Sequence, residues 1–232
     1  MQKIFLTLLI FSACIFNGNA QKKKANPYNL PITATIQEYQ GECVKNGQNT
    51  LIDIQKVIPG IQLDIRYATA NNFTGRQVYS FPNAFLRKPA ADSLVAVQKE
   101  LASMGLGLKI FDAYRPYTAT LLFHEIVKDT LFAASPATGS RHNRGCSVDV
   151  SLVDLKTGAE LAMPTEYDNF TAKAGARYPD LQLTVLQNRD LLIRVMDKHG
   201  FKVMPSEWWH FDFNGWQSFS LMDLSAEELV VK

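Results

Sequence analysis

Apolar and polar side chains follow two different periods along the first part of the chain. Residues 61–67 alternate between apolar and polar positions, as strands with one buried face do. Residues 89–104 instead space their apolar side chains three or four positions apart, which predicts an amphipathic helix ending at Gly105. The predicted apolar stripe of this helix consists of Leu94, Val97, Leu101 and Met104.

The rest of the chain continues with strands and helices in irregular order. The patterns predict strands over residues 108–114 and 146–152, helices over residues 116–132 and 185–199, and an extended segment running into Phe213. A regular alternation of strands and helices would indicate a parallel sheet, and it is missing here. We therefore predict an α+β fold, in which helices pack on a mainly antiparallel sheet.

The N-terminal segment has the composition of an export signal. Lys3 precedes an apolar stretch over residues 4–16, and residues 18–20 form a small-residue cleavage site, which together predict a signal peptide over residues 1–20. The residues ending at Cys14 also resemble a lipoprotein cleavage site, so a lipid anchor on Cys14 is an alternative processing route. We expect an exported protein in the periplasm.

One folded domain is expected after this signal. Residues 21–50 begin with three lysines and contain little periodic apolar sequence, so we expect an exposed leader or linker. A chain of 232 residues with 47% apolar side chains can bury one substantial core. The folded domain is therefore expected over residues 51–232.

Charge and cysteine content narrow the function classes. The formal net charge is only +2, without the excess of lysine and arginine that nucleic-acid recognition normally needs. After the signal, no apolar segment is long enough to predict a transmembrane span. Cys43 and Cys146 would be the two cysteines of the mature chain, too few for a disulfide framework, and the sequence does not decide whether they pair.

Two of the four histidines lie in settings typical of a metal site. His142 precedes Asp149 by seven positions, and Gly145 between them permits a turn that returns the chain. Asp149 is expected on the polar side of its strand, and His210 follows Glu207 and two tryptophans. A catalytic zinc site commonly uses three nitrogen or oxygen ligands and leaves one position open. His142, Asp149 and His210 supply one such set, hence one zinc ion per chain on the sheet.

Glu207 is the candidate proton carrier beside this metal site. It lies three residues before His210, so in a regular strand the two side chains would point to opposite faces. We therefore expect a bend at residues 205–207 before strand pairing begins. The alternative interpretation is that Glu207 is a solvent-exposed carboxylate and His210 a buried structural histidine.

Arg115 is the candidate for stabilising negative charge in the transition state. It lies at the end of a predicted strand, between a tyrosine and Pro116, where its position would be fixed. A guanidinium there could face the oxyanion that forms when water adds to an amide carbonyl. A surface salt bridge with Asp112 or another acid is the alternative role.

Five ordered motifs together resemble the D-alanyl-D-alanine dipeptidase family, which includes the vancomycin-resistance zinc dipeptidases. The resemblance extends over about residues 51–225. The motifs are Ile-Arg-Tyr-Ala-Thr at 65–69 with Asn-Asn-Phe-Thr-Gly at 71–75, Asp-Ala-Tyr-Arg-Pro at 112–116, the segment 140–149, Met-Pro-Thr-Glu-Tyr-Asp at 163–168, and Glu-Trp-Trp-His at 207–210.

The resemblance implies a role for each matching residue. It makes His142, Asp149 and His210 the zinc ligands, Glu207 the general base and acid, and Arg115 the residue that stabilises the transition state. It also implies that Tyr67, Ser140 and Asp168 shape a small substrate pocket, in which Asp168 receives the free amine of the substrate. The expected reaction is zinc-dependent hydrolysis of the dipeptide D-alanyl-D-alanine by activated water.

Two other functions remain open from the sequence. A related zinc peptidase could cut a D,D- or L,D-bond in longer peptidoglycan peptides, although an amine-binding Asp168 favours substrates with a nearby free N-terminus. A non-catalytic cell-wall binding protein could instead hold a structural zinc or none. Structural zinc usually has four protein ligands, often including cysteine, so the position of Cys146 separates this alternative from an enzyme.

Overall fold

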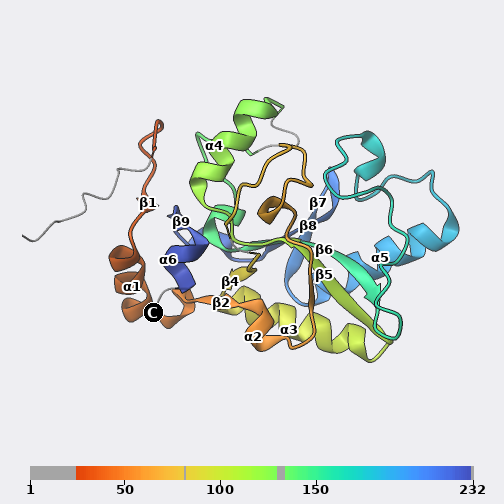
Figure 1. The fold of residues 1–232 in the computed structure, drawn as a ribbon. Helices are drawn as coiled ribbons and strands as arrows, with labels where there is room; N and C mark the ends of the chain where they lie inside the picture. The colour runs from red at the N-terminus through yellow and green to blue at the C-terminus, as the bar shows by residue number, and fades with distance from the viewer. Residues whose placement is uncertain (1–24, 81, 130–133, 231–232) are drawn as a thin grey trace, which may run out of the picture.

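The computed structural model describes residues 25–80, 82–129 and 134–230, and its centre is a five-stranded sheet with the order β3-β5-β6-β8-β7 (Figure 1). Only the pairing of β3 with β5 is parallel in this sheet, and the other neighbours are antiparallel. The strands are β3 (Gln62–Leu63), β5 (Leu106–Asp112), β6 (Ser147–Asp154), β7 (Phe201–Met204) and β8 (Glu207–Phe213). The predicted α+β fold with a mainly antiparallel sheet is confirmed.

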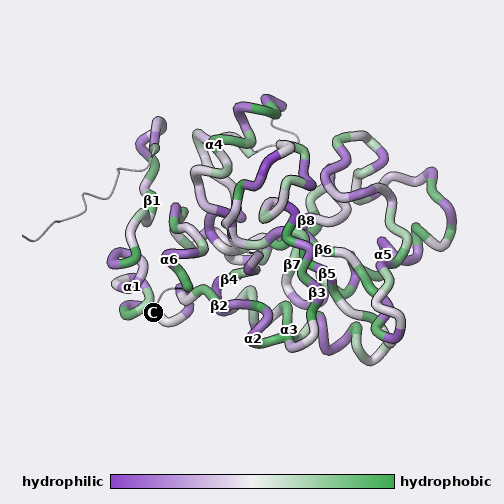
Figure 2. Tube along the Cα trace, viewed as in Figure 1, coloured by the Kyte–Doolittle hydropathy of each residue, from purple (hydrophilic) through white to green (hydrophobic). Residues whose placement is uncertain are grey.

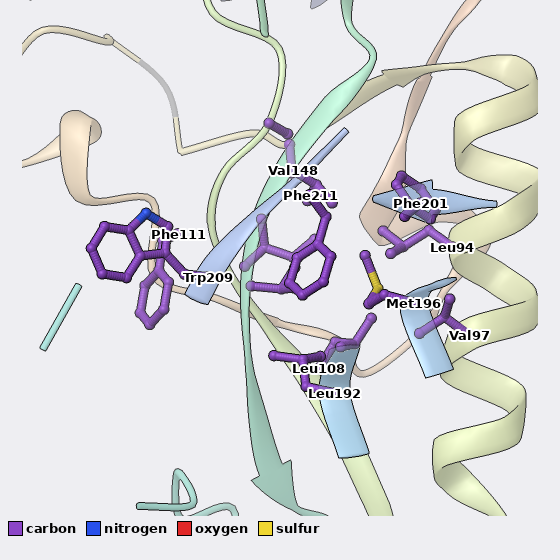
Figure 3. Close-up of a cluster of buried hydrophobic side chains, with 14 of the residues drawn as sticks. Leu94, Val97, Leu108, Phe111, Val148, Leu192, Met196, Phe201, Trp209 and Phe211 are labelled. Atoms are coloured by element: carbon purple, nitrogen blue, oxygen red, sulfur yellow. The ribbon is translucent and has the colours of Figure 1, made fainter. Parts of the chain in front are cut away.

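Two long helices, α3 (Lys88–Ala102) and α5 (Leu183–Lys198), pack together against the sheet. Figure 3 shows Leu94 and Val97 of α3 gathered with Met196 of α5 and Phe211 of β8 in the buried core. Figure 2 shows hydrophobic positions concentrated along the central strands. The predicted helix over 89–104 is confirmed except at its end. Met104 lies beyond α3 and is 46% exposed, because the chain already turns there toward Gly105, whose φ is +76°.

Helix α4 (Tyr117–Ile126) lies across the sheet from α3 (Figure 1) and supplies the buried Phe123. It begins directly after Pro116, as predicted, but ends before residue 132. The strand predicted over residues 61–67 is also shorter than expected. The chain leaves the sheet after β3 and forms a 3-10 turn at Arg66–Ala68, where the Tyr67 carbonyl accepts hydrogen bonds from the backbone N–H groups of Val78 and Tyr79.

The N-terminal segment is folded against the C-terminal one. Strand β1 (Ile32–Thr33) pairs in parallel with β9 (Leu221–Met222), and α1 (Ile36–Lys45) begins with a capping box formed by Thr35 and Glu38. The exposed leader expected over residues 21–50 therefore contains ordered elements from Ile32 onward, although α1 has no buried residue. Strand β1 has only 2 residues, too few to show a period, and its partner β9 lies about 190 residues away in sequence.

Arg87 connects this N-terminal segment to the domain. It lies at the end of β4 (Phe85–Arg87), which pairs with β2 (Leu51–Asp53), and its side chain is fully buried. The guanidinium donates hydrogen bonds to the carbonyls of Asn49, Arg144 and Ser220. These bonds connect the end of the N-terminal segment at Asn49 with the turn before β6 at Arg144 and with Ser220, just before β9. The remaining short elements are α2 (Ile54–Val57), α6 (Ala226–Val230) and 3-10 turns at Gly47–Asn49, His142–Arg144, Ala172–Ala174 and Trp216–Ser218.

The predicted signal peptide and Cys14 lie outside the described residues. Across the part of the chain that the structure describes, no helix combines the length and apolar character needed to cross a bilayer.

Candidate metal centre and active site

A turn and a strand register bring His142, Asp149 and His210 together. His142 lies in a 3-10 turn, His142–Arg144, that ends at Gly145 in the left-handed conformation, with φ +68°. Glycine adopts this conformation without the steric cost that a side chain adds. The chain then enters β6, in which Asp149 is paired directly with His210 of β8. Directly opposed residues of antiparallel strands point to the same face, so the two side chains meet.

The three side chains form a buried group of converging ligand atoms. One nitrogen or oxygen atom from each lies within 4.8 Å of the others. Asp149 Oδ1 is 3.3 Å from His142 Nε2 and 3.0 Å from His210 Nδ1, and the two ring nitrogens are 3.1 Å apart. Asp149 Oδ1 is also a buried oxygen without a hydrogen bond among the described residues. This set of donors fits a divalent metal ion.

The atoms of His142 and Asp149 that face away from this centre have partners of their own. His142 Nδ1 lies 2.6 Å from the Ala113 carbonyl, and the Tyr167 hydroxyl donates a 2.8 Å hydrogen bond to Asp149 Oδ2. Burial opposes ionisation of Asp149, but His142 and His210 outweigh it and hold the pKa of this carboxyl well below its usual range. The second polar atom of a ligand is typically fixed in this way in metal sites.

Glu207 reaches the same face through an irregularity in the β7–β8 hairpin. Val203 pairs with Phe211 whereas the next residue, Met204, pairs with Glu207, so β8 carries extra residues between these two pairs. The turn at residues 205–206 lies within the bend predicted over residues 205–207, but the register shift lies after Glu207, where strand pairing has already begun. This shift leaves Glu207 Oε2 at 3.9 Å from His210 Nδ1. Glu207 is only 7% exposed, so its interpretation as a solvent carboxylate is wrong. Burial raises the pKa of Glu207 to about 7, and the charge of Asp149 adds to this effect.

Arg115 lies beside this group in a buried ion pair. Its Nη2 and Nε atoms lie 2.8 and 3.1 Å from Asp112 Oδ2, and its guanidinium is 4.7 Å from the ring centroid of Phe123. Burial opposes the charge of Arg115, but Asp112 and neighbouring tyrosines keep its pKa well above the ordinary value. The salt bridge with Asp112 therefore exists, but it is buried rather than on the surface, and it fixes the guanidinium at the wall of the cavity.

All eight candidate residues line one small cavity of about 80 Å³. Ser140 lies beside His142, and the Ser140 hydroxyl accepts a hydrogen bond from the backbone N–H of His142. The Tyr67 hydroxyl donates a 2.9 Å hydrogen bond to Asp168 Oδ2. Asp168 has a φ of +59°, a left-handed conformation that aspartate tolerates better than most residues. Burial raises the pKa of Asp168 well above its usual range, and the charges of Asp149 and Glu207 contribute to the shift.

Several residues of the site were not singled out from the sequence. Tyr167 contacts Asp149, stacks on Phe111 with ring centroids 4.6 Å apart, and packs edge-on against Trp209. Its position next to Asp168 within a recognised motif was the available signal. Phe73, in the aromatic wall of the cavity, had a comparable signal because it lies in the recognised motif at 71–75. Phe123 of α4 and Phe170 of a loop lie in none of the recognised motifs.

Cys146 does not belong to the ligand group. Its thiol lies 3.5 Å from the Arg144 carbonyl, and the group of converging ligand atoms found in the described residues contains no cysteine. Cys43 and Cys146 are both free thiols. The geometry therefore gives no support to a closed structural zinc site that includes Cys146.

Comparisons with known proteins match most of the domain. The Peptidase_M15 model, described as D-ala-D-ala dipeptidase, matches residues 47–221. The D-alanyl-D-alanine dipeptidase of Escherichia coli K12 is 31% identical over 172 residues, which cover 74% of this chain and 89% of that protein. The enzyme of the same name from Enterococcus faecalis V583 is 27% identical over 184 residues, covering 71% and 91%. Among solved structures, the LdcB LD-carboxypeptidase is 19% identical, with coverage of 72% and 69% and a TM-score of 0.38.

Proposed function

Since the chain belongs to the peptidase M15 family of D-alanyl-D-alanine dipeptidases, we propose that it hydrolyses free D-alanyl-D-alanine with the help of one zinc ion. Three ligand atoms converge in a small cavity that also contains a carboxylate and a guanidinium, and this convergence is the observation that carries the proposal. His142, Asp149 and His210 would hold the ion, and two imidazoles with one carboxylate are a donor set that zinc accepts in catalytic sites.

Glu207 is the proton carrier in this proposal. Zinc supplies Lewis acidity, which polarises the scissile carbonyl and makes water easier to deprotonate. Glu207 takes the proton of the attacking water on a carboxylate oxygen and later delivers it to the nitrogen of the leaving D-alanine. Burial raises the pKa of Glu207 above its ordinary value in the metal-free chain, toward the neutral range in which a general base and acid works best.

Arg115 stabilises the negative charge that develops on the carbonyl oxygen during the attack. The buried pair with Asp112 holds the guanidinium in place before substrate arrives, so little reorganisation is needed during the reaction. The stacking of Arg115 over Phe123 restricts the guanidinium further.

Asp168 receives the ammonium group of the substrate. Asp168 is half-buried near the acidic Asp149 and Glu207, and a bound ammonium would favour its ionised form. Tyr67 holds Asp168 through its hydroxyl, and Ser140 shapes the opposite part of the pocket next to His142. An N-terminal amine at this position favours a free dipeptide over the end of a longer chain. The small volume of the cavity supports the same substrate.

We also propose that the chain is exported to the periplasm, where a small dipeptide from the cell wall is its partner. The support for this proposal is the sequence of residues 1–20, with Cys14 as the alternative site of lipid attachment. No nucleic acid is part of this proposal, because the net charge is only +2.

The substrate proposal predicts a clear order of rates. The zinc-loaded protein should release alanine from D-Ala-D-Ala at least about 100-fold faster than from N-acetyl-D-Ala-D-Ala, because acetylation removes the charge that Asp168 requires. L-Ala-L-Ala and a cell-wall pentapeptide should also be poor substrates. Faster cleavage of the pentapeptide would favour the alternative peptidase, and a zinc-bound protein inactive on all four compounds would favour a binding protein.

Substitution of Asp168 by Asn tests the amine pocket directly. Asn tolerates the left-handed backbone of this position but lacks the negative charge. We expect kcat/KM for D-Ala-D-Ala to fall by about 10- to 100-fold, with zinc content unchanged, because one desolvated charge pair with the substrate is lost. The slow hydrolysis of the acetylated dipeptide should change little. An equal loss for both substrates would contradict the proposed role of Asp168.

A further inference from the structure

Asp212 contacts the ring of His210 on the side facing away from the proposed metal site. The two residues are two positions apart in β8, so the period of the strand places their side chains on the same face. Asp212 Oδ1 is 2.9 Å from His210 Nε2, while the other ring nitrogen, Nδ1, points to Asp149. His210 is therefore held between two carboxylates, one on each side of its ring.

Asp212 is itself fixed by two further hydrogen bonds. The Ser147 hydroxyl donates a 2.6 Å bond to Asp212 Oδ1, and Arg141 Nη1 donates a 2.9 Å bond to Oδ2. Ser147 is the residue paired directly with Asp212 across the β6–β8 ladder. Arg141 lies 4.9 Å from the ring centroid of Trp216, which restrains its guanidinium from the other side.

These contacts decide which nitrogen of His210 carries a proton. An ionised carboxylate only accepts hydrogen bonds, so the close contact with Asp212 requires His210 Nε2 to be the donor. A neutral imidazole with the proton on Nε2 has its lone pair on Nδ1. Nδ1 is the atom that faces Asp149 Oδ1 and His142 Nε2, where a metal ion would lie.

We propose that Asp212 is a positioning residue for the metal site, which holds the ring of His210 with Nε2 protonated and the Nδ1 lone pair directed at the ion. The inference rests on the proposed zinc site. A purely structural role makes a different prediction, because a partly exposed ion pair such as Arg141–Asp212 contributes little to stability and has no reason to change metal affinity.

Two substitutions separate these roles. Asp212→Ala removes the acceptor and should weaken zinc binding by about 10- to 100-fold, the effect typical of residues that orient a metal-binding histidine. Asp212→Asn keeps an amide oxygen that can accept from Nε2, so its loss should be several-fold smaller. Zinc affinity is measured by competition with a chromophoric chelator, and the absorption spectrum of the cobalt-substituted proteins reports the ligand geometry.

Asp64→Ala is the matched control. Asp64 also makes close ion pairs on the same sheet, at 2.9 Å from Arg66 and 3.0 Å from Lys109, but it contacts none of the three proposed ligands. Its zinc affinity and cobalt spectrum should equal those of the unaltered protein. Thermal unfolding of each metal-free variant verifies that the fold is retained.

The possible results test the role of Asp212 separately from the proposed dipeptidase function. Zinc binding by Asp212→Ala as tight as in the unaltered protein would overturn the positioning role while leaving the dipeptidase proposal intact. Equal losses in the Ala and Asn variants would contradict the hydrogen-bond argument. If the unaltered protein bound no zinc or released no alanine from D-Ala-D-Ala, the proposed function itself would fail.

Discussion

Replacement of Glu207 by Gln should leave zinc bound and lower kcat for D-Ala-D-Ala by at least about 100-fold. Gln has nearly the same size as Glu and fits the same buried position, but it cannot accept a proton at neutral pH. The three proposed ligands do not include Glu207, whose Oε2 atom is 3.9 Å from His210 Nδ1. Proton transfer should therefore be lost without loss of the metal. Steady-state rates and metal analysis on the same preparation measure both properties.

Glu166→Gln is a matched control for this experiment. Glu166 is an exposed acid two residues before Asp168, and it does not line the cavity. The same chemical change at this position should leave both kcat and zinc content unaltered. Loss of zinc from Glu207→Gln would instead make Glu207 a ligand, and near-normal turnover by the zinc-loaded variant would overturn its role as proton carrier.

The convergence of His142, Asp149 and His210 could be predicted in part, because part of its geometry follows from local rules. The alternation of β6 separates Asp149 from Val148 and Val150, and a glycine turn connects His142 to that strand within a few residues. The direct pairing of Asp149 with His210 is a long-range fact that alternation alone does not give. The family resemblance supplied that link before the sheet register was known.

The surroundings of these three side chains were harder to predict, since they depend on contacts between distant segments. Tyr167 comes from a loop, and its hydroxyl reaches Asp149 only because its ring stacks on Phe111 of β5. The ion pair of Arg115 with Asp112 was foreseen as a contact, but its burial depends on Tyr67 and Phe123 covering it. The spacing of residues in the sequence predicts which side chains are neighbours within one helix or strand. It does not predict which side chains from other segments cover them.

The N-terminal segment shows the same limit at the level of the fold. Helix α1 has a recognisable capping box, yet its stripe is too weakly apolar to predict packing, and none of its residues is buried. Its attachment depends on β1 pairing with β9 and on Glu42, whose carboxylate accepts hydrogen bonds from Thr33 and Ser220. Polar contacts of this kind leave no hydrophobic period in the sequence.

Replacement of His142 by Ala should abolish tight zinc binding and, with it, dipeptide hydrolysis. His142 is 1% exposed and provides one of the three converging atoms, so its removal leaves one imidazole and one carboxylate. We expect zinc affinity to fall by more than the roughly 100-fold that loss of a ligand's neighbour causes. Zinc should raise the Tm of the unaltered protein but not of this variant, because only a folded state that binds the ion is stabilised by it.

His199→Ala is the matched control for the His142→Ala experiment. His199 follows α5, and its Nε2 atom lies 2.7 Å from Glu100 Oε2, in a contact that includes none of the proposed ligands. This variant should retain one zinc per chain after dialysis against a weak chelator, together with full activity. Loss of zinc from His142→Ala alone would assign the ion to the proposed site. Full, tight zinc occupancy in His142→Ala would exclude His142 as a ligand and would require a different metal centre.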